Sequence, residues 1–176
     1  MKITLSTHLT ALAAATLLGP GIAWGQHDDA HAGPTMNYHE IDHRLATGGH
    51  FVDDGLDDVR DKGIMVVIDL RDKPPAGQKE KLAGAGIEWI NVPVVWKDPK
   101  PGDFERFVEV MSQHDGDNVL VQCQGNYRAS AMTYLYRVLV ADVPEAAARK
   151  DLNAVWEPEG RWREYMDSII DSHDGQ

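Results

Sequence analysis

The segment Ile64–Leu70 constrains the fold of this chain more than any other. Its sequence is Ile-Met-Val-Val-Ile-Asp-Leu, in which Asp69 alone is polar. A continuous apolar run of this length is typical of a strand buried on both faces, as found in parallel sheets covered by helices. Two further runs read as buried strands, Ile87–Val95, which Pro93 interrupts or ends, and the short Asn118–Gln122.

Segments with helical signals lie between and after these strands. Helices are predicted over Val52–Lys62, Pro75–Ala85, Asp103–His114, Arg128–Val140, Pro144–Val155 and Gly160–Ile170, and a less regular strand over Tyr38–Leu45. Strands that alternate with helices predict an α/β fold with a central, largely parallel sheet flanked by helices. Because such sheets bind ligands at the carboxyl ends of their strands, residues that directly follow a strand are the first functional candidates.

The N-terminal residues have the pattern of an export signal. An apolar run, Leu9–Leu18, follows Lys2 and precedes small residues up to Gly25. The run is shorter than the roughly 20 residues that span a bilayer. We therefore expect a signal peptide over residues 1–25, a flexible leader over 26–36 and one domain over 37–172, with a periplasmic or secreted protein and no stable membrane insertion after cleavage.

The overall charge excludes one class of partner. The chain has 17 Lys and Arg against 28 Asp and Glu, a formal net charge of −11. Nucleic-acid binding depends on many Lys and Arg contacts to phosphates, so no nucleic-acid partner is expected. His39, His43 and His50 have no supporting Cys or carboxylate spacing, so neither a metal nor another cofactor is implied.

The chain has a single cysteine, Cys123, which cannot form an internal disulfide. A free Cys is most often a small buried apolar residue. Here, however, Cys123 directly follows the predicted strand Asn118–Gln122 and precedes a predicted helix. A strand-to-helix loop directs several backbone N–H groups and the positive end of a helix dipole at one point, which favours anion binding and a nucleophilic thiolate.

The residues after Cys123 fit such an anion-binding loop. Arg128 adds a planar guanidinium that can bind two oxygens of a tetrahedral anion. Gly125 and Asn126 tolerate the unusual backbone angles that a tight loop requires. Cys123 and Arg128 are therefore predicted to be catalytic, and the intervening residues to bind the substrate: Gln124, Gly125, Asn126 and Tyr127.

This loop resembles the signature loop of the cysteine-dependent protein phosphatases. More narrowly, the chain resembles bacterial dual-specificity-phosphatase-like proteins related to the phosphatase-like domain of beta-lactamase-hydrolase-like proteins. The resemblance covers most of residues 37–170, and its other markers are Val67–Arg71, Val92–Trp96, Tyr134–Val138 and Val155–Pro158.

The resemblance implies a covalent mechanism. The thiolate at the position of Cys123 attacks phosphorus, Arg128 and the loop amides hold the remaining oxygens, and water later hydrolyses the phosphocysteine. Ser130 lies where such phosphatases have a hydroxyl that steadies the thiolate, although it could equally bond its own helix backbone. Asp98 is the first candidate for the general acid, although it could equally be an ordinary turn residue. Asp103 is the second, and its other interpretation is a helix cap.

Two departures from the family pattern keep other functions open. Four residues separate Cys123 from Arg128, whereas the phosphatase loop usually has five and the rhodanese loop, which carries a persulfide, has four. The residue before the cysteine is Gln122 instead of the usual His. The alternatives are a rhodanese-like sulfur transferase that uses a Cys123 persulfide, or a catalytically silent anion-binding module. The expected substrate is a phosphorylated or sulfur-bearing anion.

Two other predictions concern residues near this loop. Arg71 follows the strand Ile64–Leu70 at the same sheet edge, where it is either a substrate contact or, more simply, a surface charge. Trp96, Trp156 and Trp162 are expected to pack in the core.

Overall fold

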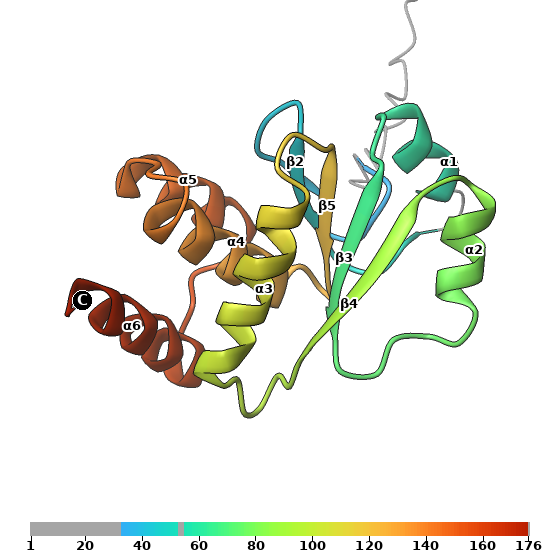
Figure 1. Ribbon diagram of the computed structural model, residues 1–176. Coiled ribbons are helices and arrows are strands. Elements are labelled where there is room, and N and C mark those ends of the chain that lie inside the picture. Colours follow the sequence, from blue (N-terminus) through green and yellow to red (C-terminus); the bar gives the residue numbers. More distant parts are fainter. Residues whose placement is uncertain (1–32, 53–54, 176) are drawn as a thin grey trace, which may run out of the picture.

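The computed structural model describes residues 33–52 and 55–175 (Figure 1). The predicted signal peptide and most of the predicted leader lie outside the described residues.

In this part of the chain, five strands form one sheet in the order β1-β2-β5-β3-β4. Their bounds are His39–Glu40 for β1, Leu45–Gly48 for β2, Val66–Arg71 for β3, Glu88–Val94 for β4 and Val119–Gln122 for β5. β1 is antiparallel to β2, and all other pairs are parallel. The prediction of a largely parallel sheet is therefore confirmed.

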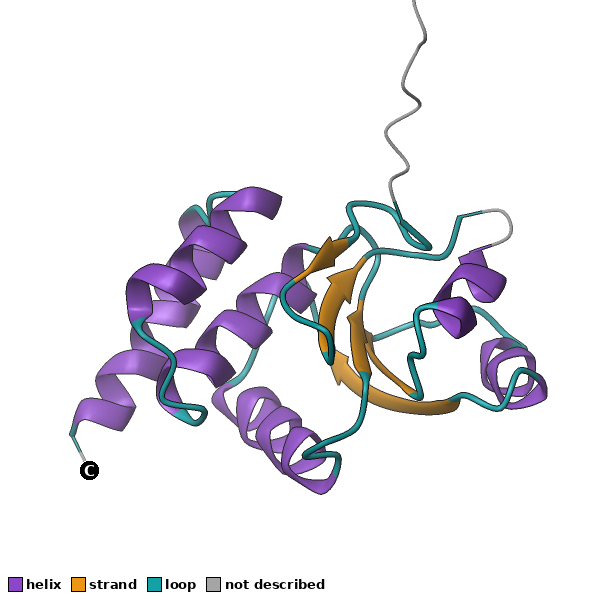
Figure 2. Ribbon diagram, turned by 90° about the horizontal axis from the view of Figure 1, so that it is seen from above, coloured by secondary structure: helices purple, strands orange, loops and turns teal. Residues whose placement is uncertain are grey.

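Helices cover both faces of the sheet (Figure 2). The described residues contain α1 Gly55–Asp61, α2 Gln78–Gly84, α3 Pro101–Gln113, α4 Tyr127–Leu139, α5 Glu145–Val155 and α6 Gly160–Asp174. Helices α1 and α2 lie on one face, and α3 to α6 lie on the other (Figures 1 and 2). Among these helices, none has the length and apolar character that crossing a membrane requires.

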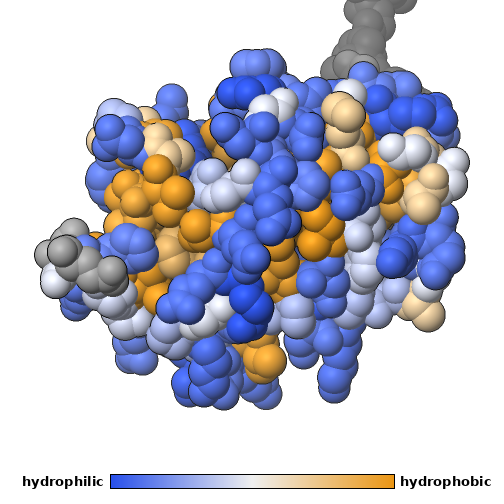
Figure 3. Space-filling view, viewed as in Figure 1, coloured by the Kyte–Doolittle hydropathy of each residue, from blue (hydrophilic) through white to orange (hydrophobic). Residues whose placement is uncertain are grey.

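The central strand β3 explains why two cores form. Every residue of β3 is buried. Val66, Ile68 and Leu70 pack into the larger core beneath α3 to α6, whereas Val67 packs into the smaller core beneath α1 and α2. This alternation confirms that the apolar run is a strand buried on both faces. On the outside, polar side chains cover most of the face seen in Figure 3, with apolar residues in the seams between elements.

The predicted strand Tyr38–Leu45 is wrong in its middle. The chain turns between β1 and β2, where the Asp42 carboxylate accepts hydrogen bonds from the backbone N–H groups of Arg44 (2.8 Å) and Leu45 (3.0 Å). This local bonding by an Asp side chain favours a turn over a continuous strand. Helix α2 also begins later than predicted, after Gly77, whose φ of 78° is left-handed.

The predicted leader is ordered at its end. Thr35 pairs with Phe51 in an antiparallel bridge. Met36 N–H donates to His50 O (2.9 Å), and Gly49 N–H donates to Met36 O (2.7 Å). Residues 35 and 36 thus belong to the folded domain, because they pair with the segment that follows β2.

Candidate active site

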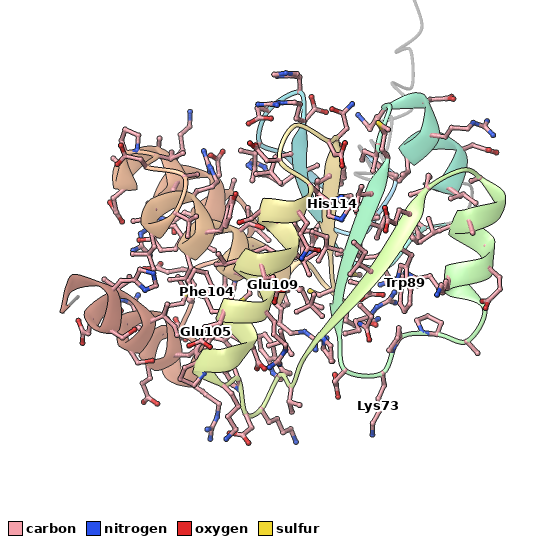
Figure 4. All side chains as sticks on the ribbon, viewed as in Figure 1. Lys73, Trp89, Phe104, Glu105, Glu109 and His114 are labelled. Atoms are coloured by element: carbon pink, nitrogen blue, oxygen red, sulfur yellow. The ribbon has the colours of Figure 1, made fainter. Side chains whose placement is uncertain are left out.

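The loop 123–126 joins β5 to α4 at the carboxyl edge of the parallel strands. Segment 72–77 after β3 and segment 95–100 after β4 lie at the same edge, and Lys73 projects from it in Figure 4. Because the first-turn N–H groups of a helix have no intrahelical partner, the start of α4 offers free donors beside the loop. The structure therefore brings the predicted loop and a helix N-terminus together, as expected.

Cys123 is the first residue of this loop and is buried. It is a free cysteine, 1% exposed, and packs with the larger core. Its N–H donates to Gly48 O (2.9 Å), which continues the pairing of β5 with β2. Two residues that follow Cys123 are exposed, Gln124 in the loop and Tyr127 at the start of α4, the latter to 41%.

Bonds to its neighbours fix the backbone of the loop. His50 donates to Gln124 O from its N–H (3.0 Å) and from Nδ1 (2.9 Å). Asn37 Nδ2 donates to Gly125 O (3.1 Å). Asn126, which is fully buried and left-handed with φ 69°, donates from Nδ2 to Asn37 O (2.6 Å). The loop is consequently held from outside at three successive residues.

Arg128 is anchored at the edge of the loop. Its side chain is 7% exposed, and Nη1 donates to Val94 O (2.6 Å) and to the Asp72 carboxylate (3.1 Å). Desolvation opposes ionisation of Asp72, but the hydrogen bond and charge of Arg128 prevail and lower the pKa of that carboxyl. Among the residues that the structure describes, none accepts a hydrogen bond from Nε or Nη2 of Arg128, so these groups remain for a ligand.

Ser130 bonds its own helix. Its hydroxyl donates to Asn126 O (2.8 Å) and accepts a hydrogen bond from Trp156 Nε1 (3.1 Å). Within the described chain, Ser130 has no hydrogen bond to Cys123. This is the geometry of the backbone-bonding alternative, and a role beside the thiolate stays a prediction.

The two candidate acids lie in different environments. Asp98 is in the segment after β4, with its side chain 58% exposed and paired with Lys100 Nζ (2.6 Å). Asp103 is buried, accepts a hydrogen bond from Lys100 N (2.8 Å) and pairs with Arg106. Asp103 therefore caps α3, and Asp98 is the accessible one of these two candidates.

Comparisons with known proteins now decide the family. A family model described as "DSP-PTPase phosphatase fused to NAD+ Kinase" matches residues 23–167. The chain belongs to this DSP-PTPase phosphatase family. No curated protein matches the chain.

Solved phosphatase structures share the fold. A phosphatase candidate from Shewanella putrefaciens CN-32 has 27% identity and a TM-score of 0.68, with 79% of this chain and 94% of that chain covered. PTPMT1 in complex with PI(5)P has 16% identity and a TM-score of 0.64, with 78% and 97% covered. The core catalytic domain of the PP-IP phosphatase SIW14 from S. cerevisiae has 11% identity and a TM-score of 0.66, with 81% and 90% covered. The last two likenesses concern the fold alone.

In this DSP-PTPase chain, Gln122 belongs to a buried polar network. Its Oε1 accepts a hydrogen bond from Gln78 Nε2 (2.8 Å), and its Nε2 donates to Gly49 O (2.9 Å). Arg71 and Asp69, both buried, form an ion pair behind it, with Arg71 Nη2 2.6 Å from Asp69 Oδ2. Arg71 is thus neither a surface charge nor an exposed substrate contact, because its guanidinium neutralises a buried carboxylate.

Aromatic rings flank the loop on the side of Tyr127. Its ring lies 5.1 Å from that of Trp156 and 6.2 Å from that of Trp96, between ring centroids. Trp162 stacks under Trp96 at 5.3 Å and donates from Nε1 to Trp96 O (3.1 Å). Trp162 packs in the core as predicted, but Trp96 is 39% exposed and forms part of the rim.

Sequence reasoning missed Asp72 and Asn37 and underestimated Gln122. Asp72 directly follows Val67–Arg71, one of the segments that resemble the phosphatases. Its place after a predicted strand could therefore have identified it as a residue of the site. Nothing local marks Asn37, whose partner Gly125 is 88 residues away. No group of three or more His, Cys, Asp or Glu side chains is arranged for metal binding in the described chain.

Proposed function

We propose that this DSP-PTPase family member hydrolyses phosphomonoesters through a phosphocysteine at Cys123. The observation that carries the proposal is the position of the cysteine, at the carboxyl end of β5, next to the start of α4 and the anchored guanidinium of Arg128. A thiolate, free first-turn N–H groups and a fixed cation at one point suit an incoming phosphate.

In the first step, the Cys123 thiolate forms a bond to phosphorus while the bond between phosphorus and the ester oxygen breaks. The loop N–H groups of residues 124–127 and the free nitrogens of Arg128 bind the three other oxygens and stabilise their charge in the transition state. Asp98 donates a proton to the departing alkoxide, which leaves as an alcohol.

In the second step, water attacks phosphorus and the bond between sulfur and phosphorus breaks. Asp98, now a carboxylate, takes a proton from the water, inorganic phosphate departs and the thiolate is regenerated. Ser130 would assist this step by turning its hydroxyl from Asn126 O toward the sulfur, where it would donate a hydrogen bond to the departing thiolate. Its present bond to Asn126 O makes it the least supported of the four predicted catalytic residues.

Family membership favours this proposal over sulfur transfer. The matched family is a phosphatase family, and the solved structures named above are phosphatases or phosphatase candidates. Nothing in these comparisons supports the rhodanese-like alternative, whose basis is the four-residue interval alone. The silent anion-binding module differs from the proposal by a single property, which is turnover.

The test is phosphate release from a small aryl phosphate by the freshly reduced protein between pH 5 and 8. We expect release by the parent protein and none above background from Cys123→Ser. Asp98→Asn should remove the dependence on a protonated acid and slow alkyl phosphates more than aryl phosphates, because aryl oxides leave without protonation. A folded, reduced parent protein that binds phosphate but releases none would refute the hydrolase proposal in favour of the silent module.

We also propose a periplasmic or secreted location, which the signal-like pattern of residues 1–25 supports. N-terminal sequencing of the protein recovered from the periplasmic fraction should begin near residue 26. Recovery of the full chain from the cytoplasm would contradict it.

A further inference from the structure

The phosphate-binding loop is the inner member of a small antiparallel ladder. Gly125 pairs with Gly49, and the neighbouring His50 N–H donates to Gln124 O (3.0 Å). Segment 49–51 pairs in turn with residues 35 and 36. The loop is distant in sequence from both other segments: Gln124 is 74 residues from His50, and Gly125 is 88 residues from Asn37.

Asn37 connects the outer segment directly to the loop. Its Nδ2 donates to Gly125 O (3.1 Å), and its carbonyl accepts a hydrogen bond from Asn126 Nδ2 (2.6 Å). Asn37 has a φ of 48°, in the left-handed region that non-glycine residues rarely adopt and that Asn tolerates. Two opposite bonds thus join one residue to two successive residues of the loop.

These bonds restrict the direction of the loop N–H groups. In a planar trans peptide, the C=O and the N–H point in opposite directions. The bond from Asn37 to Gly125 O therefore fixes the N–H of Asn126, as the bonds from His50 to Gln124 O fix the N–H of Gly125. A cradle whose donors are fixed before the anion arrives loses less entropy on binding.

The Asn126 side chain serves the same purpose. It is completely buried, and its Nδ2 also donates to Thr47 Oγ1 (3.0 Å). Glycine at this position would reach the same left-handed angle with less strain, but it would lack both bonds. The amide group thus holds the end of the loop against β2 and Asn37 at once.

We propose that Asn37 is a positioning residue of the anion-binding loop, and that it acts through Gly125 and Asn126 without contacting the substrate. This inference rests on the proposed function only in that phosphate binds at this loop. It does not require turnover.

The experiment measures binding of inorganic phosphate by calorimetry in a Cys123→Ser background, which separates binding from chemistry. Asn37→Asp keeps the size of the side chain and replaces the donor with an acceptor that faces Gly125 O. Asn37→Gly removes the side chain and permits the same φ. The matched control is Asn118→Asp, since Asn118 Nδ2 donates to Gly63 O (2.9 Å) at the opposite edge of the sheet.

We expect Asn37→Gly to weaken phosphate binding about fivefold, the usual effect of one lost hydrogen bond, and Asn37→Asp to weaken it more. Asn118→Asp should leave the phosphate affinity unchanged. Its urea unfolding midpoint should fall about as much as those of the Asn37 variants, because it also loses one side-chain hydrogen bond to a backbone carbonyl. Should an Asn37 variant fail to fold, Asn126→Gly breaks the companion bonds and is expected to give the same loss.

Folded Asn37 variants with the affinity of the Cys123→Ser parent would overturn the inference, and so would a parent that binds no phosphate. The hydrolase proposal can fail separately. A wild-type protein that binds phosphate without releasing any from an ester would refute that proposal alone, and the loss in the Asn37 variants would still be measured.

Discussion

Replacing Arg71 with Met removes the partner of a carboxylate that has no access to water. Asp69 is 0% exposed, and Arg71 bonds both of its oxygens, at 2.9 Å from Nε to Oδ1 and 2.6 Å from Nη2 to Oδ2. Loss of one member of a buried ion pair typically costs about 3–5 kcal/mol, because the other charge is left buried. In the variant, neutral donors from Gln78 (3.1 Å) and Trp89 (3.3 Å) continue to bind the Asp69 carboxylate. We therefore expect a cost at the lower end of this energy range.

We therefore expect Arg71→Met to lower the free energy of unfolding by about 3 kcal/mol. With a typical urea dependence of about 2 kcal/mol per molar, the unfolding midpoint falls by about 1.5 M. Asp69→Asn should also destabilise strongly, because it leaves the guanidinium as the unpaired buried charge. The double variant Asp69→Asn/Arg71→Met has no buried charge and should lose less than about 1.5 kcal/mol.

The measurement is urea unfolding of the four proteins, followed by tryptophan fluorescence and circular dichroism to verify a two-state transition. The expected signature is a double variant that is more stable than either single variant. A midpoint shift below about 0.5 M for Arg71→Met, or a double variant whose loss equals the sum of the two single losses, would refute the argument that this pair is a coupled buried charge.

Three further predictions concern the loop and its supports. Gly49→Ala should destabilise the fold and abolish phosphate binding, because an added Cβ would lie 2.8 Å from Gln124 O and 2.9 Å from Met36 O. An unchanged urea unfolding midpoint would contradict this prediction. Asp72→Asn should cost less than about 1 kcal/mol at pH 7, since Asp72 is 36% exposed. Because Arg128 lowers the pKa of Asp72, the carboxylate stabilises the fold fully at a pH above its ordinary pKa near 4. The cost of Asp72→Asn in urea titrations should therefore vanish as the pH falls through the lowered pKa. A cost that grows on acidification would contradict this prediction. Ser130→Ala should remove the acceptor of Trp156 Nε1 and shift its fluorescence, and an unchanged emission spectrum would show that the bond is absent in solution.

The layered fold could be predicted because its signals are local. The apolar run of β3 and the helical spacing of α3 and α4 each lie within one short segment, and all three appear within a few residues of their predicted bounds. The strand predicted over Tyr38–Leu45 failed for an equally local reason. Asp42 bonds the backbone ahead of it, and this turn chemistry outweighs strand propensity.

The candidate site was predictable only in part. Cys123 and Arg128 are close in sequence, and the strand-to-helix context places them together. The partners that orient Arg128 and the loop come from segments distant in sequence: Asp72 is 56 residues from Arg128, and Asn37 is 89 residues from Asn126. Gln122 illustrates the same limit, because its departure from the usual His suggested a weakened site, whereas its amide belongs to a buried network that only the packing of β3, α2 and β5 creates.

The ladder that supports the loop also determines when a working site can exist during folding. Contacts across nearly ninety residues form late, because the entropy of closing so long a stretch of chain must be overcome before any of its bonds can form. The local strand-loop-helix segment around Cys123 can assemble earlier, but its donors then have no defined direction. A fragment that lacks residues 35–37 would therefore have the thiol without the Asn37 bonds that direct the loop donors.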